Sequence, residues 1–441
     1  MSSTPVLSVA VIGAGPAGLY LTDALLRHEG REVRVDVFDR LPTPFGLLRY
    51  GVAPDHLKMK ALAKPLAKVV ADPRVRFIGN LEIGRDLDVD LLRSKYSAVV
   101  HAYGAALDRT LGIPGEDLPG STSAASFVRW YSGHPDNTTA LPDGRAVEAE
   151  HAVVVGAGNV AVDVARILIK SAQELHGTDV PDEVLALLHA SPITDVHMLI
   201  RRGPAQVKFT AKELRELGEI DGVDVLVPSE ALELAEADLD AIAEDRMLGR
   251  SVDVLREWAL REPTGAQRRL HVHFWTSPIA IEGSEAVTGV VVSARSDDGA
   301  RETTIPAELV VRCVGYRGLA LPGVPFDEES GTIPNDHGRV LRDGVPCVGE
   351  YAAGWISRGP TGVIGSNKSD AGRVVELMLG DDLPDVEVWD VVAHLHEAGL
   401  ATVDHDGWLE IDRAEITAGE SRGGVRAKLA TWDELLAASR G

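Results

Sequence analysis

The pattern of apolar and polar positions contains the same unit twice: a short apolar run, a glycine-rich turn, and apolar residues at helical spacing. The first copy runs through Val9–Ile12 into GAGPAG at residues 13–18, and the second runs through Ala152–Val155 into GAGNVA at residues 156–161. Apolar runs of this length predict buried strands, and the spacing after each turn predicts the apolar face of a helix. The pattern therefore predicts a strand, a tight turn and a helix in both places.

Both turns have the G-x-G-x-x-G/A spacing that accommodates the pyrophosphate of a dinucleotide. The first glycine permits the tight turn, the second lets the pyrophosphate approach the backbone, and the third position lets the helix pack on its strand. One such turn is weak evidence, because glycine-rich turns are common. Two in this context indicate two bound nucleotides, a flavin and a nicotinamide that exchange hydride. The positions are Gly13, Gly15 and Gly18 in the first turn, and Gly156, Gly158 and Ala161 in the second.

The residues that end the next strand of each unit distinguish the two nucleotides. The first such strand, predicted at Val33–Phe38, ends in Asp39, and a carboxylate there accepts hydrogen bonds from the ribose hydroxyls of an unphosphorylated adenosine, which favours FAD. The second, predicted at Val196–Ile200, ends in Arg201 and Arg202. Arginines there suit a 2′-phosphate through forked, charge-assisted hydrogen bonds and favour NADP(H). Because this strand follows its turn later than usual, we expect an elongated helix and an insertion over residues 162–194.

These motifs predict an α/β fold with two Rossmann-like dinucleotide-binding domains, the NADP domain inserted into the FAD domain. The first part of the FAD domain is expected over residues 1–107 and the NADP-binding domain over residues 108–324. Residues 325–441 form the second part of the FAD domain. They end in an acidic, helix-rich extension, including a helix over Val386–His396, which we expect on the outside of the domain without a chemical role.

Composition narrows the function classes. The chain has 44 basic and 67 acidic residues, a net charge of −23, which argues against nucleic acid as a partner. Its two cysteines, Cys313 and Cys347, form no disulfide framework and no C-x-x-C, which favours a reducing compartment and argues against a flavoenzyme with a redox-active dithiol. No apolar run approaches the roughly 18 residues of a membrane span. The N-terminal apolar stretch lacks a basic leader and leaves no room for a transit peptide, so we expect a cytoplasmic protein away from membranes.

Two further patterns have metal-ligand character, but their context argues against a metal. His271 and His273 lie in an alternating stretch, Leu270–Trp275, that predicts a strand with both histidines on one face. Asp404–Gly407 resembles the start of a calcium loop but lacks the bidentate glutamate at the proper offset. We therefore expect no metal site.

The chain resembles the adrenodoxin-reductase-like ferredoxin–NADP⁺ reductases, FAD flavoproteins that carry electrons between NADPH and a small iron–sulfur protein. The resemblance extends from Val9 to about Gly380, and its most specific stretch is GWISRGPTGVIG at residues 354–365. The other matching stretches are LPTPFGL at 41–47, YGVAPDH at 50–56, IPGED at 113–117, GNVAVD at 158–163, IRRGP at 200–204 and VGYRG at 314–318. Together they are far more specific than either glycine turn.

The resemblance implies a site in which the nicotinamide transfers hydride to the flavin. His56 and Glu213 are implied beside the two rings, where they influence hydride transfer, and a helix starting at Thr361 or Gly362 is implied to direct its N-terminus at the flavin. The implied FAD-binding residues are Gly13, Gly15, Pro16, Ala17, Asp39, Gly46, Leu47, Ile83, Trp355, Gly362, Val363 and Ile364. Those implied for NADP(H) are Arg109, Gly158, Asn159, Val160, Arg201, Arg202 and Glu213.

Some of these residues also have plainer local interpretations. Asp55 could cap a helix that begins at His56 or Leu57, which would leave His56 an ordinary first-turn residue. Glu213 could be a surface carboxylate of a helix, and Gly362 a simple helix-start glycine.

The resemblance implies ferredoxin or a similar small iron–sulfur protein as the partner. Because ferredoxins are usually acidic, this acidic chain must bind one through a local basic patch or associate with it only weakly. Arg246 and Arg250 are candidates, with Arg256, Arg268 and Arg269 nearby, although any single one is better explained as a solvated surface charge paired with the abundant Asp and Glu. Other functions remain open: an electron-input unit similar to the glutamate synthase small subunit, whose extra cysteine-ligated clusters two cysteines cannot supply, a non-catalytic NADPH-sensing flavoprotein, and, less favoured, a flavin monooxygenase.

Overall fold

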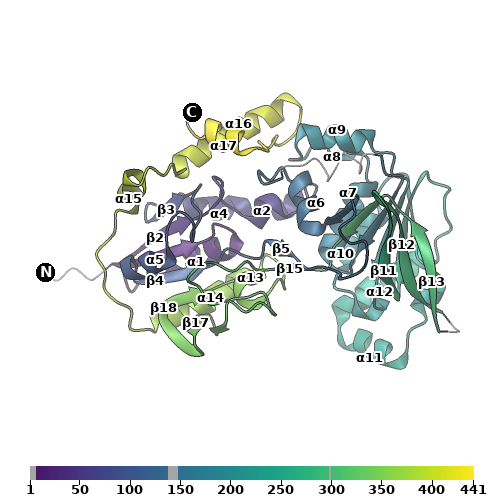
Figure 1. Cartoon of the computed structure of the whole chain (residues 1–441), viewed down its shortest axis with the longest axis horizontal. Coiled ribbons are helices and arrows are strands. Elements are labelled where there is room, and N and C mark those ends of the chain that lie inside the picture. Colours follow the sequence, from purple (N-terminus) through teal and green to yellow (C-terminus); the bar gives the residue numbers. More distant parts are fainter. Residues whose placement is uncertain (1–5, 138–147, 297–298) are drawn as a thin grey trace. The chain divides into compact units, whose positions relative to one another are not determined.

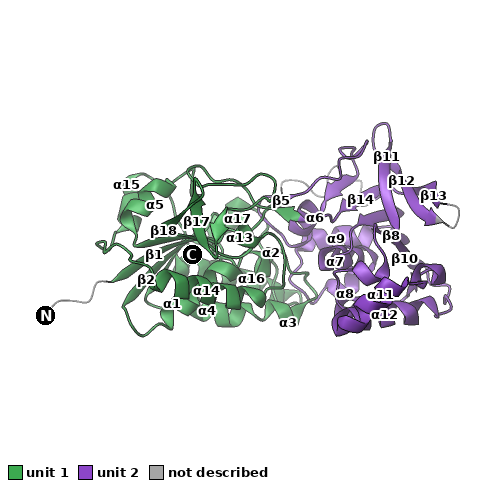
Figure 2. Cartoon of the chain, turned by 90° about the horizontal axis from the view of Figure 1, so that it is seen from below, with its two compact units in different colours: residues 1–107, 316–441 green, residues 108–315 purple. Residues whose placement is uncertain are grey.

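The structure is a computed structural model that describes residues 6–137, 148–296 and 299–441. The chain forms two compact units, which Figure 2 colours separately: unit 1 comprises residues 1–107 and 316–441, and unit 2 comprises residues 108–315. Unit 2 is thus inserted between the two parts of unit 1, and the predicted fold class is confirmed.

The chain passes between the units at two paired segments. β5 (Leu107–Asp108) leads into unit 2 and β15 (Tyr316–Arg317) leads back, and the two form a two-stranded sheet. The return therefore occurs at Tyr316, earlier than the expected position after residue 324, because the pairing with β5 ends unit 2 at Gly315.

Unit 1 is built on a sheet whose described residues form seven strands in the order β16-β17-β18-β4-β1-β2-β3. The strands are β1 (Leu7–Ile12), β2 (Val33–Phe38), β3 (Val75–Ile78), β4 (Ala98–His101), β16 (Asn335–Asp336), β17 (Arg339–Arg342) and β18 (Val345–Ala352). The strands from β18 to β3 run parallel, while β16 and β17 pair antiparallel. β1 lies between β2 and β4, at the kind of position where open α/β sheets bind their ligands.

Burial on both faces explains why β1 is apolar throughout. Leu7, Val9 and Val11 point into one core, and Ala10 and Ile12 point into the other. Helices cover the two faces, as Figure 1 shows. The first core contains residues of α1 (Pro16–Leu26), α4 (Ala63–Val70) and α14 (Ser366–Leu379), and the second contains residues of α5 (Val89–Lys95) and α15 (Val391–Glu397).

Unit 2 contains a parallel sheet whose described residues form six strands in the order β6-β14-β7-β8-β10-β9. The strands are β6 (Ser121–Ser123), β7 (His151–Val155), β8 (Asp195–Ile200), β9 (Val223–Leu226), β10 (Arg268–Phe274) and β14 (Leu309–Arg312). One face packs on α6 (Ala124–Tyr131), α7 (Asn159–Ile169), α10 (Ala211–Gly218) and α12 (Arg246–Ala259). The other packs on an antiparallel sheet of β11 (Thr276–Gly283), β12 (Val287–Ser296) and β13 (Gly299–Pro306).

The segment between α7 and β8 differs from the expected elongated helix. α7 ends at Ile169, and two further helices follow, α8 (Ala172–Leu175) and α9 (Asp182–Ala190). A capping box begins α8: the Ser171 side chain accepts from the backbone while the Glu174 side chain bonds back to Ser171. The late position of β8 therefore comes from added helices.

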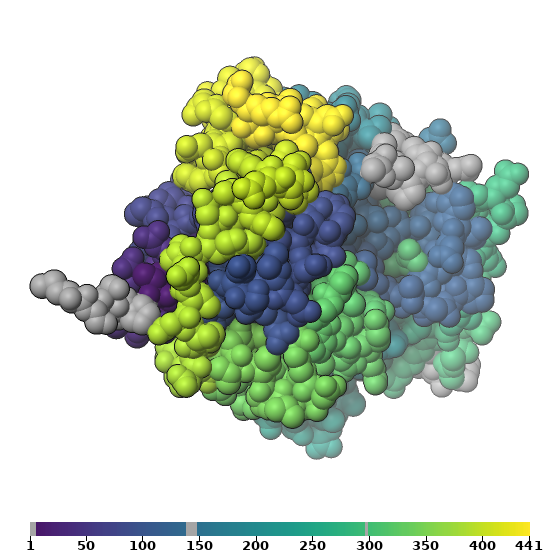
Figure 3. Space-filling view, turned by 60° about the vertical axis from the view of Figure 1, so that its left-hand side comes forward, coloured from purple at the N-terminus to yellow at the C-terminus, as the bar shows by residue number. Residues whose placement is uncertain are grey.

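The C-terminal segment runs over the surface of unit 1 as the yellow-green to yellow band in Figure 3. It contains α15, α16 (His405–Ser421) and α17 (Trp432–Ala438). The helix expected over Val386–His396 begins only at Val391, because Asp390 caps it by accepting from the N–H of Ala393. The segment also contributes to both cores of unit 1. Trp408 and Ile411 are buried in the first core, and Val391 and Leu395 in the second.

Within the described ranges, none of the helices has both the length and the apolar character that a membrane crossing requires.

Candidate nucleotide-binding sites in the two units

In unit 1, the first glycine turn leaves the carboxyl end of β1 in a conformation that favours glycine. Gly13 has a φ of +112°, and a Cβ atom there would lie 2.6 Å from the carbonyl oxygen of Ala102, which follows β4. The N–H of Gly13 donates to the carbonyl of Phe38, the last residue of β2 (2.7 Å). Gly13 is therefore held between the ends of both neighbouring strands.

The helix after this turn has room for a phosphate group at its N-terminus. α1 begins at Pro16 with Gly15 at its N-cap and no side-chain cap. Among the described residues, a Cβ atom on Gly15 would meet only the Cα atom of Gly46 within 4 Å, at 3.9 Å. At Gly18, by contrast, a Cβ atom would lie 2.0 Å from a backbone oxygen of the turn. The helix thus packs tightly on its strand, while its first turn, which includes Ala17, presents backbone N–H groups suited to an anion.

Asp39 connects the end of β2 to the glycine turn. Its Oδ2 accepts from the N–H of Ala14 (2.8 Å) and its Oδ1 from the N–H of Leu41 (2.9 Å). Burial raises the pKa of Asp39, and these two N–H groups and Arg40 oppose the rise. Each carboxylate oxygen retains a further lone pair. Asp39 can therefore accept ribose hydroxyls in addition to its backbone contacts.

A second loop, at Phe45 and Gly46, packs against the same turn, and the backbone of this loop is strained. Phe45 and Gly46 both have positive φ angles, +84° and +47°. The N–H of Phe45 donates to the carbonyl of Ala14 (2.8 Å), and a Cβ atom on Gly46 would lie 2.9 Å from the Cα atom of Gly15. A bulky residue at positive φ is costly and persists where the surroundings enforce it, often at binding sites. The next residue, Leu47, begins α2 (Leu47–Tyr50) and is 38% exposed.

The stretch at residues 354–365 returns to this turn. Gly354 has a φ of +73°, and a Cβ atom there would lie 2.5 Å from the Cβ atom of Ala17. Trp355, the first residue of α13 (Trp355–Arg358), stacks on Tyr316 with ring centroids 5.9 Å apart and 22° between the planes. The structure therefore places Trp355 one residue from the contact with α1. The sequence alone did not indicate Tyr316 as a site residue.

The helix expected to start at Thr361 or Gly362 starts at Ser366. The reason is Gly362, whose φ of +81° is left-handed and incompatible with a helix start. Val363 and Ile364 follow in a turn, and the Ser366 hydroxyl donates to the carbonyl of Val363 (2.7 Å). The backbone N–H groups that a ligand would meet here therefore belong to a loop, in which Val363 is 61% exposed.

Arg358 joins this loop to α14. Its Nε donates to Asp370 (2.7 Å), and its Nη2 donates to Ser366 (3.2 Å) and to Asn367 (3.1 Å). Its Nη1 is buried and has no hydrogen-bond partner within the described residues. A buried donor without a partner is uncommon. Nη1 is therefore available to a bound carbonyl or anion, and Nη2 of the same guanidinium would lie 3.7 Å from a Cβ atom on Gly362.

His56 and Ile83 complete the predicted residues of unit 1. His56 is at the N-cap position of α3 (Leu57–Lys60), so Asp55 does not cap this helix as the local interpretation had it. His56 is buried, with 7% of its surface exposed, and its N–H donates to the carbonyl of Ala53 (3.1 Å). Ile83 is buried in the same core as Ile12, the last residue of β1.

Unit 2 repeats the geometry of the first turn. The N–H of Gly156 donates to the carbonyl of Leu199 near the end of β8 (3.0 Å), and a Cβ atom on Gly156 would lie 2.4 Å from the carbonyl oxygen of Cys313, which follows β14. Leu199 and Cys313 thus occupy the places that Phe38 and Ala102 occupy in unit 1. The same backbone architecture supports both turns.

The N-terminus of α7 is the open side of the second turn. A Cβ atom on Gly158 would meet no described atom within 4 Å. Asn159 and Val160 begin the helix, and Ala161 is fully buried beneath them. The Oδ1 atom of Asn159 is buried and has no hydrogen-bond partner in the described part of the chain. It is an acceptor that a bound hydroxyl or amide would satisfy.

Three cationic residues lie close to this turn along the backbone. Arg201 and Arg202 follow β8 and are exposed, and within the described residues their side chains form no hydrogen bond or ion pair. The third, Lys208, was missed from the sequence. Its N–H donates to the carbonyl of Ala157 in the turn (2.9 Å), because the short helix η2 (Pro204–Gln206) folds the chain back. No spacing rule indicates such a return.

Glu213 and Arg109 are the remaining predicted residues of unit 2. Glu213 lies on α10 with 7% of its surface exposed, so it is not the surface carboxylate of the local interpretation. Its Oε2 is buried, and the described residues offer it no hydrogen-bond partner. Arg109 is exposed, and its N–H donates to the carbonyl of Gly315 (2.9 Å). His56 thus belongs to unit 1 and Glu213 to unit 2.

Known proteins are similar to nearly the whole chain. The pyridine nucleotide-disulphide oxidoreductase family matches residues 7–366. The NADPH-ferredoxin reductase FprA of Mycobacterium tuberculosis is 42% identical over 455 residues, which cover 97% of this chain and 98% of the relative. The mitochondrial NADPH:adrenodoxin oxidoreductase of Arabidopsis thaliana is 37% identical over 473 residues, which cover 99% and 96% of the two chains.

A solved structure shows the same fold. Mycobacterium tuberculosis FprA in complex with NADPH matches with a TM-score of 0.90 and 40% identity, covering 99% of this chain and 100% of that chain.

Proposed function

Because this chain belongs to the pyridine nucleotide-disulphide oxidoreductases, in the branch of the NADPH-ferredoxin reductases, we propose that it passes electrons from NADPH through FAD to a small iron–sulfur protein of the ferredoxin type. It is an FAD flavoprotein and an NADPH-dependent oxidoreductase. The two nucleotides are those that its glycine turns predict.

The observation that carries the proposal is the contrast between two turns of the same build. The turn of unit 1 ends beside Asp39, an acceptor for ribose hydroxyls. The turn of unit 2 lies beside Arg201, Arg202 and Lys208, three cations that suit the extra phosphate of NADPH. The pair of turns therefore supports one site for FAD and one for NADP(H).

When bound, FAD would supply the chemistry that takes up a hydride and gives out single electrons. The residues of the chain itself bind FAD and orient it. Asp39 accepts the ribose, the first turn of α1 receives the pyrophosphate, and Nη1 of Arg358 donates to an acceptor near the loop at Gly362. Trp355, stacked on Tyr316, contributes an apolar wall that excludes water.

We assign His56 and Glu213 to the positioning of the nicotinamide against the flavin. Both are buried, and the unpartnered Oε2 of Glu213 is an acceptor that a bound amide would satisfy. Glu213 would thereby orient the ring that delivers hydride, since orientation of the reacting groups lowers the barrier.

For the partner, we propose docking through Arg246 and Arg250 on α12. Both are exposed, and no ion pair or hydrogen bond of their side chains is found within the described ranges. The other candidate arginines are engaged: Arg256 pairs with Asp253, Arg268 donates to the carbonyl of Ile169, and Arg269 pairs with Asp195. We also propose that the enzyme works in the cytoplasm, because its two cysteines are both unpaired.

An anaerobic titration tests the proposal. NADPH is added to the purified yellow protein while the visible flavin bands are followed, and oxidised ferredoxin is then added. Bleaching by NADPH and reoxidation by ferredoxin is the expected result. Failure of NADPH to bleach the flavin would contradict the function, and bleaching without reoxidation would contradict ferredoxin as the acceptor.

Steady-state turnover with ferricyanide separates an enzyme from an NADPH sensor. An enzyme passes electrons to this one-electron acceptor repeatedly, whereas a sensor is reduced once and then stops. We expect sustained turnover that depends on NADPH.

A further inference from the structure

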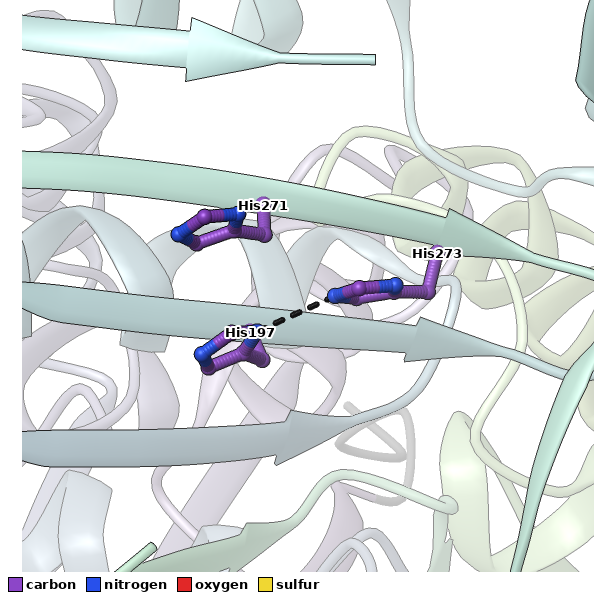
Figure 4. A group of neighbouring side chains, drawn as sticks. All are labelled: His197, His271 and His273. Carbon is purple, nitrogen blue, oxygen red and sulfur yellow. Dashed lines mark hydrogen bonds between the residues drawn. The ribbon is translucent and has the colours of Figure 1, made fainter. Parts of the chain in front are cut away.

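Three histidines from two neighbouring strands of unit 2 lie face to face (Figure 4). His197 belongs to β8, and His271 and His273 belong to β10. The register of the two strands pairs His271 with His197. Because alternate residues of a strand share a face, His273 projects on the same side as the other two. The sheet therefore gathers three imidazole rings, although His197 and His273 are 76 positions apart.

The distances within the group are those of a site for a small cation. The Nδ1 of His197 lies 3.0 Å from the Nε2 of His273. Each of the three residues has a ring nitrogen within 4.8 Å of the others. Two imidazole nitrogens on one tetrahedral zinc ion lie about 3.3 Å apart, given Zn–N bonds of about 2.0–2.1 Å. An ion between His197 and His273 would thus replace their shared hydrogen after a small movement.

The third ring is oriented by a carboxylate. His271 stacks on His197, with ring centroids 4.3 Å apart and 11° between the planes, so it needs a rotation to bring its lone pair to the same ion. Its Nε2 lies 2.8 Å from Oδ1 of Asp195, which leaves Nδ1 as the nitrogen available for coordination. Asp195 is itself held by Arg269 (2.7 Å). A carboxylate bonded to the outer nitrogen of a ligating histidine is the usual support of such sites.

An ion could reach these rings from solvent, because the three histidines are only partly buried. None of these residues contributes to the glycine turn or to the arginines after β8. The cluster is therefore a separate feature of unit 2 that electron transfer does not explain.

We propose that His197, His271 and His273 bind one late first-row divalent ion, Zn²⁺ in the first place, with water as a further ligand and Asp195 orienting His271. Imidazole ligands favour zinc, copper and nickel, and the scarcity of oxygen ligands disfavours magnesium and calcium. The expectation of no metal in the strand at residues 270–275 considered two histidines, and the structure adds a third from β8.

A bound ion would link β8 and β10 just before the ends of these strands, where NADPH is proposed to bind. β8 continues into Arg201 and Arg202, and β10 continues into Trp275, whose N–H donates to the carbonyl of Arg202 (3.3 Å). The ion would thus stabilise unit 2 without contacting a cofactor.

Metal analysis of the untagged full-length FAD protein tests the proposal. The protein is stripped with a chelator, dialysed against Zn²⁺ and analysed for bound metal, and a second sample is titrated with Co²⁺ while its visible absorption is recorded. We expect about one ion per chain and the intense bands of tetrahedral Co²⁺. Absence of stoichiometric Zn²⁺, or only the weak spectrum of hydrated Co²⁺, would overturn the site.

Variants locate the ion. His197→Gln and His273→Gln should each abolish stoichiometric binding, and Asp195→Asn should weaken it by about 10- to 100-fold as a support of a ligand. His189→Gln, an exposed histidine of α9, is the matched control and should bind as the wild type does. Equal binding by all four variants would place the metal elsewhere and refute the assignment. Should a ligand variant fail to fold, the wild-type Co²⁺ spectrum still decides.

Discussion

Arg49 and Glu415 face each other in a buried, two-pronged ion pair, with Nη1 2.9 Å from Oε2 and Nη2 2.5 Å from Oε1. Arg49 lies in α2, directly after the strained loop at Phe45, and Glu415 lies in α16 near the end of the chain. Glu415 also accepts from Arg426 (2.8 Å). The C-terminal segment is therefore anchored to the loop that presses on the FAD-binding turn.

We expect Glu415→Gln to destabilise unit 1 and to weaken FAD retention. Removing one partner of a buried pair typically costs about 3–5 kcal/mol, because the other charge stays buried without compensation. Chemical denaturation and the flavin-to-protein absorbance ratio measure the two effects. Glu420→Gln, an exposed position of the same helix, is the control. A variant as stable as the control would show that the pair does not anchor the segment.

The acid stability of unit 1 should depend on Glu350. Burial would raise its pKa, but hydrogen bonds with His101 and Arg342 lower the pKa of Glu350 from 4.5 to about 2. Because the pKa is depressed in the folded state, the stabilisation is complete above pH 4.5 and is lost as the pH falls from 4.5 to about 2. Glu350→Gln should therefore be less stable than the wild type at neutral pH, and the difference should shrink in that window.

Urea unfolding at a series of pH values checks this expectation, with the exposed Glu376→Gln as control. A stability difference that stays constant from pH 7 to pH 3 would contradict the linkage.

Glycine substitutions should separate the two cofactors. Gly158→Ala has space for its Cβ atom, so we expect normal folding and normal FAD content, but obstruction of the NADPH pyrophosphate and at least a tenfold weaker Kd, equivalent to about 1.4 kcal/mol. Gly13→Ala introduces both strain and a clash with Ala102, so FAD should be lost. Calorimetry with NADP⁺ and flavin absorbance provide the readouts. Unchanged NADP⁺ affinity in Gly158→Ala would argue against this turn as the NADP(H) site.

The arginines after β8 should determine the preference for NADPH. A charged hydrogen bond contributes about 1.5–3 kcal/mol, so Arg201→Ala and Arg202→Ala should each raise the KM for NADPH by about 10- to 100-fold. The KM for NADH should change little. Arg301→Ala, an exposed arginine of β13, is the matched control. Equal changes for both nucleotides would exclude a 2′-phosphate contact.

His56→Ala and Glu213→Ala should slow flavin reduction while FAD stays bound. Misplacement of the reacting rings can cost up to about a hundred-fold in rate. Stopped-flow absorbance at saturating NADPH measures the rate of flavin reduction. Glu219→Ala is the control, because Glu219 is exposed at the end of α10, the helix that contains Glu213. Traces identical to the wild type would remove these residues from the mechanism.

Burial made the central strands predictable. β2 has the expected bounds, Val33–Phe38, because three valines reach one core, Phe38 reaches the other, and Asp39 ends the strand at the glycine turn. The start of α14 was not predictable, because a glycine such as Gly362 is compatible with a helix start and with the left-handed φ that prevents one. Local pattern cannot distinguish these two conformations.

The sequence pattern likewise could not predict contacts between residues that are far apart along the chain. Lys208 reaches the second turn through a backbone hydrogen bond to Ala157, and His197 joins His273 through strand register. Neither contact depends on the spacing of apolar residues in the sequence, so each is visible only in the three-dimensional structure.

The insertion of unit 2 has a consequence for synthesis. β4 pairs with β18, which follows it after the whole of unit 2, whereas the described strands of the six-stranded and three-stranded sheets of unit 2 all lie within residues 108–315. Loop closure between distant segments is slow, and domains form as their residues leave the ribosome. The NADP(H)-binding unit is therefore positioned to mature first, while β4 of the flavin-binding unit awaits β18, which is translated after the whole of unit 2.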